Sequence, residues 1–154
     1  MNQDDAFQWR LAARDAGGEA RKRHAERLRN SGIAPTPQRI DVAAVLFEKG
    51  GHFTAEQVLT TLNERQSGVS RATVYNTLNL FADRGLLKPL ALGRDCVLYD
   101  TNISAHHHMV DVTNTTLVDI PSDAIRVTGL PDLPDGASLD GVEIVVRVHQ
   151  NAAR

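Results

Sequence analysis

Three consecutive histidines, His106, His107 and His108, are the residues whose types suggest chemistry most directly. Successive side chains of an extended strand point to opposite faces, so His106 and His108 share a face and His107 faces away. Two imidazoles at that spacing can chelate a divalent ion. A surface histidine cluster without a ligand is the plainer interpretation. Ligation of heme through His106, His107 or His108 is a third.

Two carboxylates are expected near these imidazoles. If Thr113–Thr116 forms a hairpin turn, Val110 pairs with Asp119. Asp119 then lies on the same face as His108, diagonally across the hairpin. Asp100 ends the preceding predicted strand, close enough in sequence to cover the site. Two imidazoles and two carboxylates repel one another unless a cation joins them, and such a set suits Fe²⁺, Mn²⁺ or Zn²⁺.

A helix predicted to begin at Ser70 suggests a second kind of chemistry. Val74, Leu78 and Phe81 recur at helical spacing and give it an apolar inner face. Its outer face is polar and its first turn has no acidic residue, which is typical of a helix that contacts base edges in the major groove. A plain amphipathic surface helix is the alternative. The residues expected to contact DNA here are Ser70, Arg71, Thr73, Tyr75 and Asn76.

Two further helices and a hairpin must position the Ser70 helix. Thr36-Pro37 indicates an N-cap followed by proline at the first helical position. Thr54 begins the next helix with a capping box. Leu86–Leu92 and Cys96–Asp100, joined by a turn at residues 93–95, are typical of a two-stranded hairpin. Three short helices followed by such a hairpin predict a winged helix-turn-helix.

The segment before this module is basic. The stretch Ala20–Asn30 is rich in helix formers, contains Arg21 and Arg23, and stops at the C-cap signal Ser31-Gly32. It has few apolar residues, so its basic face must meet solvent or a polyanion. Residues 1–19 are expected to be an arm, in which Gly17-Gly18 ends any helix.

In the last third of the chain, residues alternate with the period of two that is typical of strands. Strands are expected at His106–Val112, Leu117–Ile120 and Val142–Val148, with a Pro/Gly-rich stretch at Gly129–Gly141 between the last two. This small unit has few aromatic residues and a modest core. We therefore expect it to pair with a second copy through the Val142–Val148 strand, giving a homodimer.

Composition and charge limit the classes of protein. The chain has 154 residues and a net charge of −2. Residues 20–94 carry a balance of +6 and residues 96–154 a balance of −5, which suggests an anion-binding module followed by a unit with another role. One cysteine, Cys96, excludes a Cys-x-x-Cys zinc site. The acidic N-terminus and the short apolar runs favour a cytoplasmic protein without a membrane span.

Four motifs together resemble the ferric uptake regulator family of bacterial metal-responsive transcription factors. They are GIAPTPQR at Gly32–Arg39, HFTAEQ at His52–Gln57, SRATVYNTLNL at Ser70–Leu80, and the His106-x-His108 strand. Two further segments, at 99–108 and 142–148, are similar to the iron response regulator branch of that family.

The resemblance implies a function and a set of residues. The regulatory metal site of the family falls on His52, Asp100, His106, His108 and Asp119. Because His52 lies in the DNA-binding half, an ion would fix the angle between the two halves. The family's DNA contacts fall on the Ser70 helix, with Tyr75 contacting bases and with Arg39 and the basic first helix contacting phosphates.

The sequence departs from the family pattern at several positions, and these departures limit the metal sites, the heme motif and the helix that we expect. Asp111 and Asn114 occupy the positions of the first structural zinc Cys pair, so that zinc site is absent. Ala105 and Arg126 occupy positions of the family's second, non-structural metal site, so that site also lacks ligands. No cysteine precedes Cys96, so heme sensing would need the His106–His108 string. Two prolines at 131 and 134 shorten the helix usual in the dimerisation domain.

The sequence thus predicts an α+β protein with three parts: an arm at 1–19, a winged-helix DNA-binding domain at 20–99, and a dimerisation and metal- or heme-sensing domain at 100–154. The expected function is a DNA-binding transcription regulator, mainly a repressor, of iron and heme homeostasis genes, acting on a double-stranded operator. We expect the iron-poor state to bind DNA. A peroxide-sensing iron- or manganese-dependent repressor is the first alternative. A small metalloenzyme is a weaker one, because no base or nucleophile accompanies the ligands.

Overall fold

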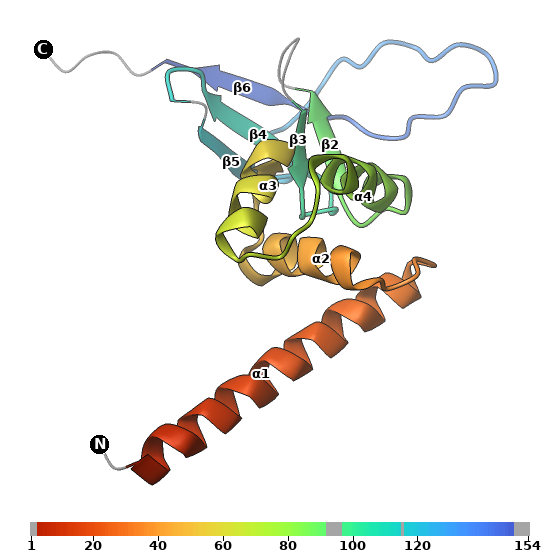
Figure 1. The fold of residues 1–154 in the computed structure, drawn as a ribbon. Helices are drawn as coiled ribbons and strands as arrows, with labels where there is room; N and C mark the ends of the chain where they lie inside the picture. Colours follow the sequence, from red (N-terminus) through yellow and green to blue (C-terminus); the bar gives the residue numbers. More distant parts are fainter. Residues whose placement is uncertain (1–2, 92–96, 115, 150–154) are drawn as a thin grey trace, which may run out of the picture. The chain divides into compact units, whose positions relative to one another are not determined.

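The structure is a computed structural model that describes residues 3–91, 97–114 and 116–149, with side chains from Gly17 onward (Figure 1). The chain divides into two compact units, residues 1–103 and residues 104–154. Among the described residues, no helix has the length and apolarity needed to cross a membrane. The boundary between the two units lies beyond Asp100. Thr101 still belongs to the first unit, and its backbone N–H donates to the carbonyl of Gly51 at 3.1 Å.

Among the described residues, the first unit consists of four helices and a small sheet. The helices are α1 (Gln3–Asn30), α2 (Pro37–Lys49), α3 (Ala55–Glu64) and α4 (Arg71–Asp83). The strands are β1 (His52–Thr54), β2 (Lys88–Ala91) and β3 (Val97–Asp100), in the antiparallel order β1-β3-β2. The wing therefore has three strands, one more than the predicted hairpin. Its turn at 93–95 and Cys96 lie outside the described residues.

Capping side chains start these helices where the sequence predicts. The Thr54 hydroxyl accepts from the Gln57 backbone N–H at 3.1 Å, and the Gln57 side chain accepts from the Thr54 N–H at 2.8 Å. Ser70 accepts from the N–H of Thr73 in the same way at the start of α4. Each bond satisfies an N–H that a helix terminus otherwise leaves unpaired. The predicted capping box and both helix starts are confirmed.

The predicted end of a helix at Gly17-Gly18 is wrong, because α1 continues through both glycines to Asn30. Neither glycine adopts a positive φ, and the flanking residues are mostly Ala, Arg and Glu. Each glycine lowers the stability of the helix by roughly 1 kcal/mol relative to alanine, and neighbours that favour a helix offset this cost. The helix ends where a left-handed glycine stops it, at Gly32 with φ 68°.

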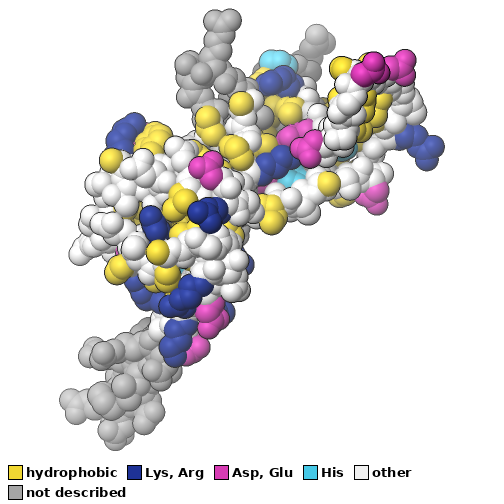
Figure 2. All heavy atoms as spheres, turned by 90° about the vertical axis from the view of Figure 1, so that its right-hand side faces the viewer, with side chains coloured by type: hydrophobic (Ala, Val, Ile, Leu, Met, Phe, Trp, Pro, Cys, Tyr) yellow, Lys and Arg dark blue, Asp and Glu magenta, His cyan; other side chains and the backbone are white. Residues whose placement is uncertain are grey.

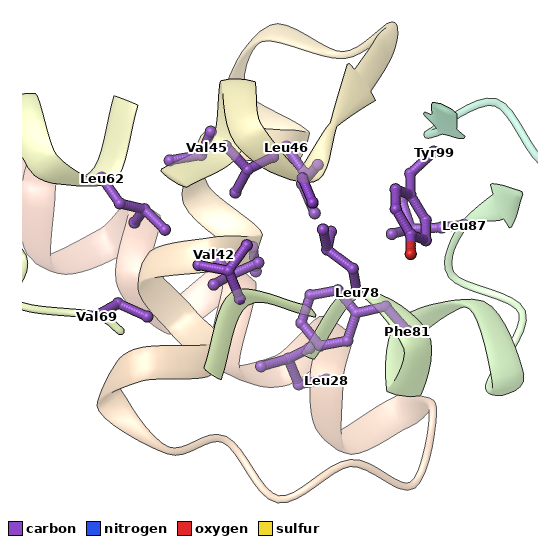
Figure 3. Packing of buried hydrophobic residues seen from close by; sticks show 14 of the residues in the cluster. Leu28, Val42, Val45, Leu46, Leu62, Val69, Leu78, Phe81, Leu87 and Tyr99 are labelled. Carbon is purple, nitrogen blue, oxygen red and sulfur yellow. The ribbon is translucent and has the colours of Figure 1, made fainter. Parts of the chain in front are cut away.

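Apolar side chains from all four helices and from β3 form the core of the first unit (Figure 3). Leu46, Leu78 and Phe81 are fully buried. Tyr99 of β3 joins the wing to this core, and its hydroxyl donates to Asn79 Oδ1 of α4 at 2.9 Å. Burial raises the pKa of Tyr99. This packing fixes α4 by its inner face and leaves its polar face outward.

The second unit is a three-stranded sheet of β4 (His106–Asp111), β5 (Thr116–Pro121) and β6 (Val145–Val148). Its order is β5-β4-β6, with β5 antiparallel and β6 parallel to β4. Between β5 and β6, residues 122–144 form turns and irregular chain without a helix. The final strand is shorter than the predicted Val142–Val148.

The predicted register of the β4–β5 hairpin is wrong by two residues. Val110 pairs with Leu117. Asp119 pairs directly with His108, whereas the two were expected to be diagonal neighbours. The turn begins one residue earlier than predicted because Asp111 Oδ1 accepts from the Thr113 N–H at 2.8 Å. A shift of two residues keeps every side chain on its face. Asp119 and His108 therefore still share a face.

Candidate metal centre and nucleic-acid interface

The first unit holds one imidazole beside one carboxylate. The β1–β3 register places His52 opposite Asp100, with His52 Nε2 3.5 Å from Asp100 Oδ2. The Asp100 side chain is fully buried, and its other oxygen accepts from the Asn102 N–H at 2.8 Å. A buried carboxylate requires partners of this kind because desolvation penalises its charge. His52 and Asp100 are thus held together by backbone pairing within one sheet.

The second unit brings together three of the predicted ligands. His106 and His108 project from the same face of β4, with their Nε2 atoms 2.9 Å apart. Asp119 Oδ1, from β5, lies 3.7 Å from His106 Nε2. Both imidazoles are buried, and His108 is fully so. The alternation that predicted a shared face is confirmed.

The outer nitrogens of these two imidazoles fix where their protons lie. His106 Nδ1 is 2.8 Å from the Ser104 carbonyl oxygen, which can only accept, so this nitrogen donates. His108 Nδ1 is 2.9 Å from Glu143 Oε1, and a carboxylate likewise accepts. In the neutral rings both Nε2 atoms then carry lone pairs. Two lone pairs at 2.9 Å, with the Asp119 carboxylate close by, repel unless a proton or a metal cation lies between them.

Glu143 is a site residue that the sequence reasoning missed. It precedes β6, whose parallel pairing with β4 puts Val145 opposite His108. Neither strand alternation nor spacing from the histidines signals this contact, because the register of a parallel pair is set by the tertiary fold.

His107 lies on the opposite face of β4 from its two neighbours. It is buried, and its Nδ1 has no hydrogen-bond partner among the residues that the structure describes. On the same sheet face an apolar hollow of about 270 Å³ is lined by Met109, Val118 and Val148 with polar neighbours, and His107 is not among its lining residues.

The outer face of α4 carries the predicted DNA-contacting residues. Arg71 and Asn76 are exposed, and Thr73 and Tyr75 are half-buried. An acidic residue that the sequence reasoning missed lies against them: Glu56 of α3. Its Oε1 accepts from the Tyr75 hydroxyl at 2.8 Å and lies 2.6 Å from an Arg71 guanidinium nitrogen.

The three other predicted DNA contacts lie on α1 and α2. Arg21 pairs with Asp41 at 2.5 Å, and Arg23 is exposed. Arg39 donates to the Ala34 carbonyl and lines a hollow of about 280 Å³ beside α4. Figure 2 shows Lys and Arg side chains over the first unit.

Comparison with known proteins agrees with this combination of elements. The family model described as the ferric uptake regulator family matches residues 30–130. The chain belongs to the ferric uptake regulator family. The predicted family and the α+β winged-helix fold are confirmed. The family match spans α2 to β5 and includes all five predicted metal ligands, whereas Glu143 lies beyond it.

Individual members of the family resemble the chain to different extents. A ferric uptake regulation protein of Synechococcus elongatus is 34% identical over 106 residues, which is 66% of this chain and 72% of that protein. A peroxide-responsive repressor of Staphylococcus epidermidis is 34% identical over 83 residues, covering 54% of this chain and 55% of the repressor. The ferric uptake regulator from Pseudomonas aeruginosa with manganese has the same fold, with a TM-score of 0.64 at 23% identity, over 82% of this chain and 97% of that one.

Proposed function

We propose that this family member is a cytoplasmic DNA-binding transcription regulator, mainly a repressor, whose affinity for DNA depends on a divalent metal ion. The observation that carries the proposal is the pair of Nε2 atoms of His106 and His108, 2.9 Å apart beside Asp119. Control of iron and heme homeostasis genes is the finer proposal, and it rests on the resemblance to iron-responsive regulators.

The donor atoms fit an iron, manganese or zinc ion. Each unit supplies preformed donors, His52 with Asp100 in the first and His106, His108 and Asp119 in the second. Imidazole and carboxylate together suit Fe²⁺, Mn²⁺ and Zn²⁺. We propose that all five bind one ion, as the family resemblance implies. An ion held by these residues would supply positive charge that offsets carboxylate repulsion, and it would link the two units.

Heme fits this donor set less well. The two Nε2 atoms of the shared face lie 2.9 Å apart, and that of His106 lies 3.7 Å from Asp119 Oδ1, which leaves little room for a macrocycle. The apolar hollow on the other face, at about 270 Å³, is below the roughly 300–1,000 Å³ of sites for smaller ligands, and His107 does not line it. We therefore propose a divalent ion as the regulatory ligand. A heme absorbance titration tests the alternative.

The proposed nucleic-acid interface is the polar face of α4. Ser70, Thr73 and Asn76 supply short hydrogen-bonding side chains, and Tyr75 supplies a ring for base contact. Arg21, Arg23 and Arg39 would contact phosphates. In a homodimer two such helices would contact a palindromic operator about one helical turn apart, or a multiple of it. The outer edge of β6, which has no partner strand among the described residues, supports pairing of two copies there.

Two variants test the metal switch, with His107→Ala as the matched control from the same strand. The probes are Zn²⁺ or Mn²⁺ and a DNA duplex selected by the protein from a random pool. His108→Ala should abolish metal binding at the site. His52→Ala should leave weaker binding that no longer changes DNA affinity. If His108→Ala binds metal as His107→Ala does, or no duplex is selected, the proposal is wrong.

A peroxide-sensing repressor is the second candidate, and the similarity to a peroxide-responsive repressor favours it. Under this alternative a ligand histidine, His52 or His106, gains an oxygen atom when the iron-loaded protein meets hydrogen peroxide. Peptide mass spectrometry detects that oxygen, with the zinc-loaded protein as control. Unmodified histidines together with DNA release by iron alone would favour the iron-responsive proposal. Because the relatives bear the names of transcription regulators, the metalloenzyme alternative is not proposed.

A further inference from the structure

We propose that Glu143 is a positioning residue of the metal centre, which holds the proton of His108 on Nδ1 and so presents Nε2 as the ligand atom. This inference deepens the proposed function and rests on it. Glu143 makes no contact with an ion in the proposal. Its role is carried out through His108.

Both the backbone and the side chain of His108 are hydrogen-bonded to the segment that contains Glu143. The backbone N–H of His108 donates to the carbonyl of Ile144 at 3.0 Å. Its side-chain Nδ1 lies 2.9 Å from Glu143 Oε1. The main-chain bond fixes the segment in register with β4, so the carboxylate is set beside the imidazole by the sheet itself. Glu143 is about one-third exposed, whereas His108 is fully buried.

A neutral imidazole has one N–H group. If that N–H is hydrogen-bonded to an acceptor, the other ring nitrogen holds the lone pair that can bind a metal. With Nδ1–H bonded to Glu143, the lone pair of His108 lies on Nε2, on the side of His106. Histidine ligands commonly donate their second N–H to a carboxylate in this way, which orients the ring and raises its basicity. The partner of His106 is the Ser104 backbone carbonyl, which no side-chain substitution removes. Glu143 is therefore the testable half of this arrangement.

The experiment compares Glu143→Ala with Asp140→Ala in the full-length protein. Asp140 is an exposed acid of the same irregular segment, so its loss changes the net charge equally. The first readout is the His108 tautomer in the metal-free protein, from long-range ¹⁵N–¹H NMR correlations. The second is Zn²⁺ affinity, from competition with a chromophoric chelator. A Glu143→Asp variant restores a carboxylate on a shorter side chain.

We expect His108 to be protonated on Nδ1 in the unmodified protein and in Asp140→Ala. In Glu143→Ala the Nε2–H form should become populated and the Zn²⁺ affinity should fall about 10- to 100-fold. Glu143→Asp should recover part of both. An unchanged tautomer in Glu143→Ala, or an affinity equal to that of Asp140→Ala, would overturn the proposal. If His108→Ala leaves Zn²⁺ binding intact, the metal centre itself fails, and the tautomer still tests the positioning role.

Discussion

Replacing Glu56 with glutamine should strengthen binding of this protein to DNA of random sequence. The Glu56 carboxylate accepts from the Tyr75 hydroxyl and pairs with the Arg71 guanidinium, which lies 5.5 Å from the centroid of the Tyr75 ring. Both α4 side chains are thus held by an acid of α3 on the face proposed to meet DNA. Glutamine keeps an acceptor for Tyr75 but removes the charge, which releases Arg71 for a phosphate.

The size of the effect follows from exposure. The Glu56 and Arg71 side chains are 52% and 66% exposed, so solvent screens their attraction. Exposed pairs of this kind contribute about 0.2–1 kcal/mol, which corresponds to roughly a 1.4- to fivefold gain in random-duplex affinity. One additional phosphate contact steepens the dependence of log K on log salt by about 0.9.

Fluorescence anisotropy with a labelled random duplex, over a series of salt concentrations, measures both quantities. Glu64→Gln is the matched control, because Glu64 is an exposed acid at the end of the same helix. We also expect Glu56→Gln to discriminate less between a selected duplex and the random one. Equal affinities and equal salt slopes for the Glu56 and Glu64 variants would refute the reasoning.

Three further predictions concern stability. Burial lowers the pKa of His24 below its usual value, although Glu48 lies nearby. As the pH falls, the unfolded chain therefore takes up a proton on His24 before the folded protein does. The free energy of unfolding should fall as the pH drops below about 6.5. Urea titrations between about pH 5 and 8 should show a smaller fall for His24→Leu. Thr54→Ala removes a capping bond and should cost about 0.5–2 kcal/mol in the same assay, with Thr60→Ala as an uncapped control. Leu46→Ala leaves a cavity in the core and should cost about 2–5 kcal/mol by chemical denaturation; a loss below 1 kcal/mol would contradict the packing shown in Figure 3.

Local signals predicted the elements of the first unit well. N-caps at Thr54 and Ser70 and the glycine at Gly32 act through bonds within a few residues, so the sequence contains all the information. Gly17-Gly18 misled because glycine also tolerates helical angles when its neighbours favour a helix.

Long-range pairing explains what the sequence could not predict. The shared face of His108 and Asp119 was predictable from a period of two, but their register depended on the turn at Asp111. Glu143 reaches His108 only because β6 returns parallel to β4 after a long connection. No local pattern encodes such a return. The contacts of Glu56 likewise depend on how α3 and α4 pack.

The long connection between β5 and β6 gives this protein a place to accept inserted sequence. Residues 122–144 join two strands of one sheet, are almost all exposed, and contain no helix or strand. The entropy of closing such a loop grows only with the logarithm of its length, so doubling it costs about 0.6 kcal/mol. A tetracysteine or epitope sequence placed near Ser138 would therefore add little to the cost of folding. Because the same loop leads into the strand that pairs with β4 beside His108, a label inserted there would lie on the segment that carries Glu143, outside the proposed ligand set.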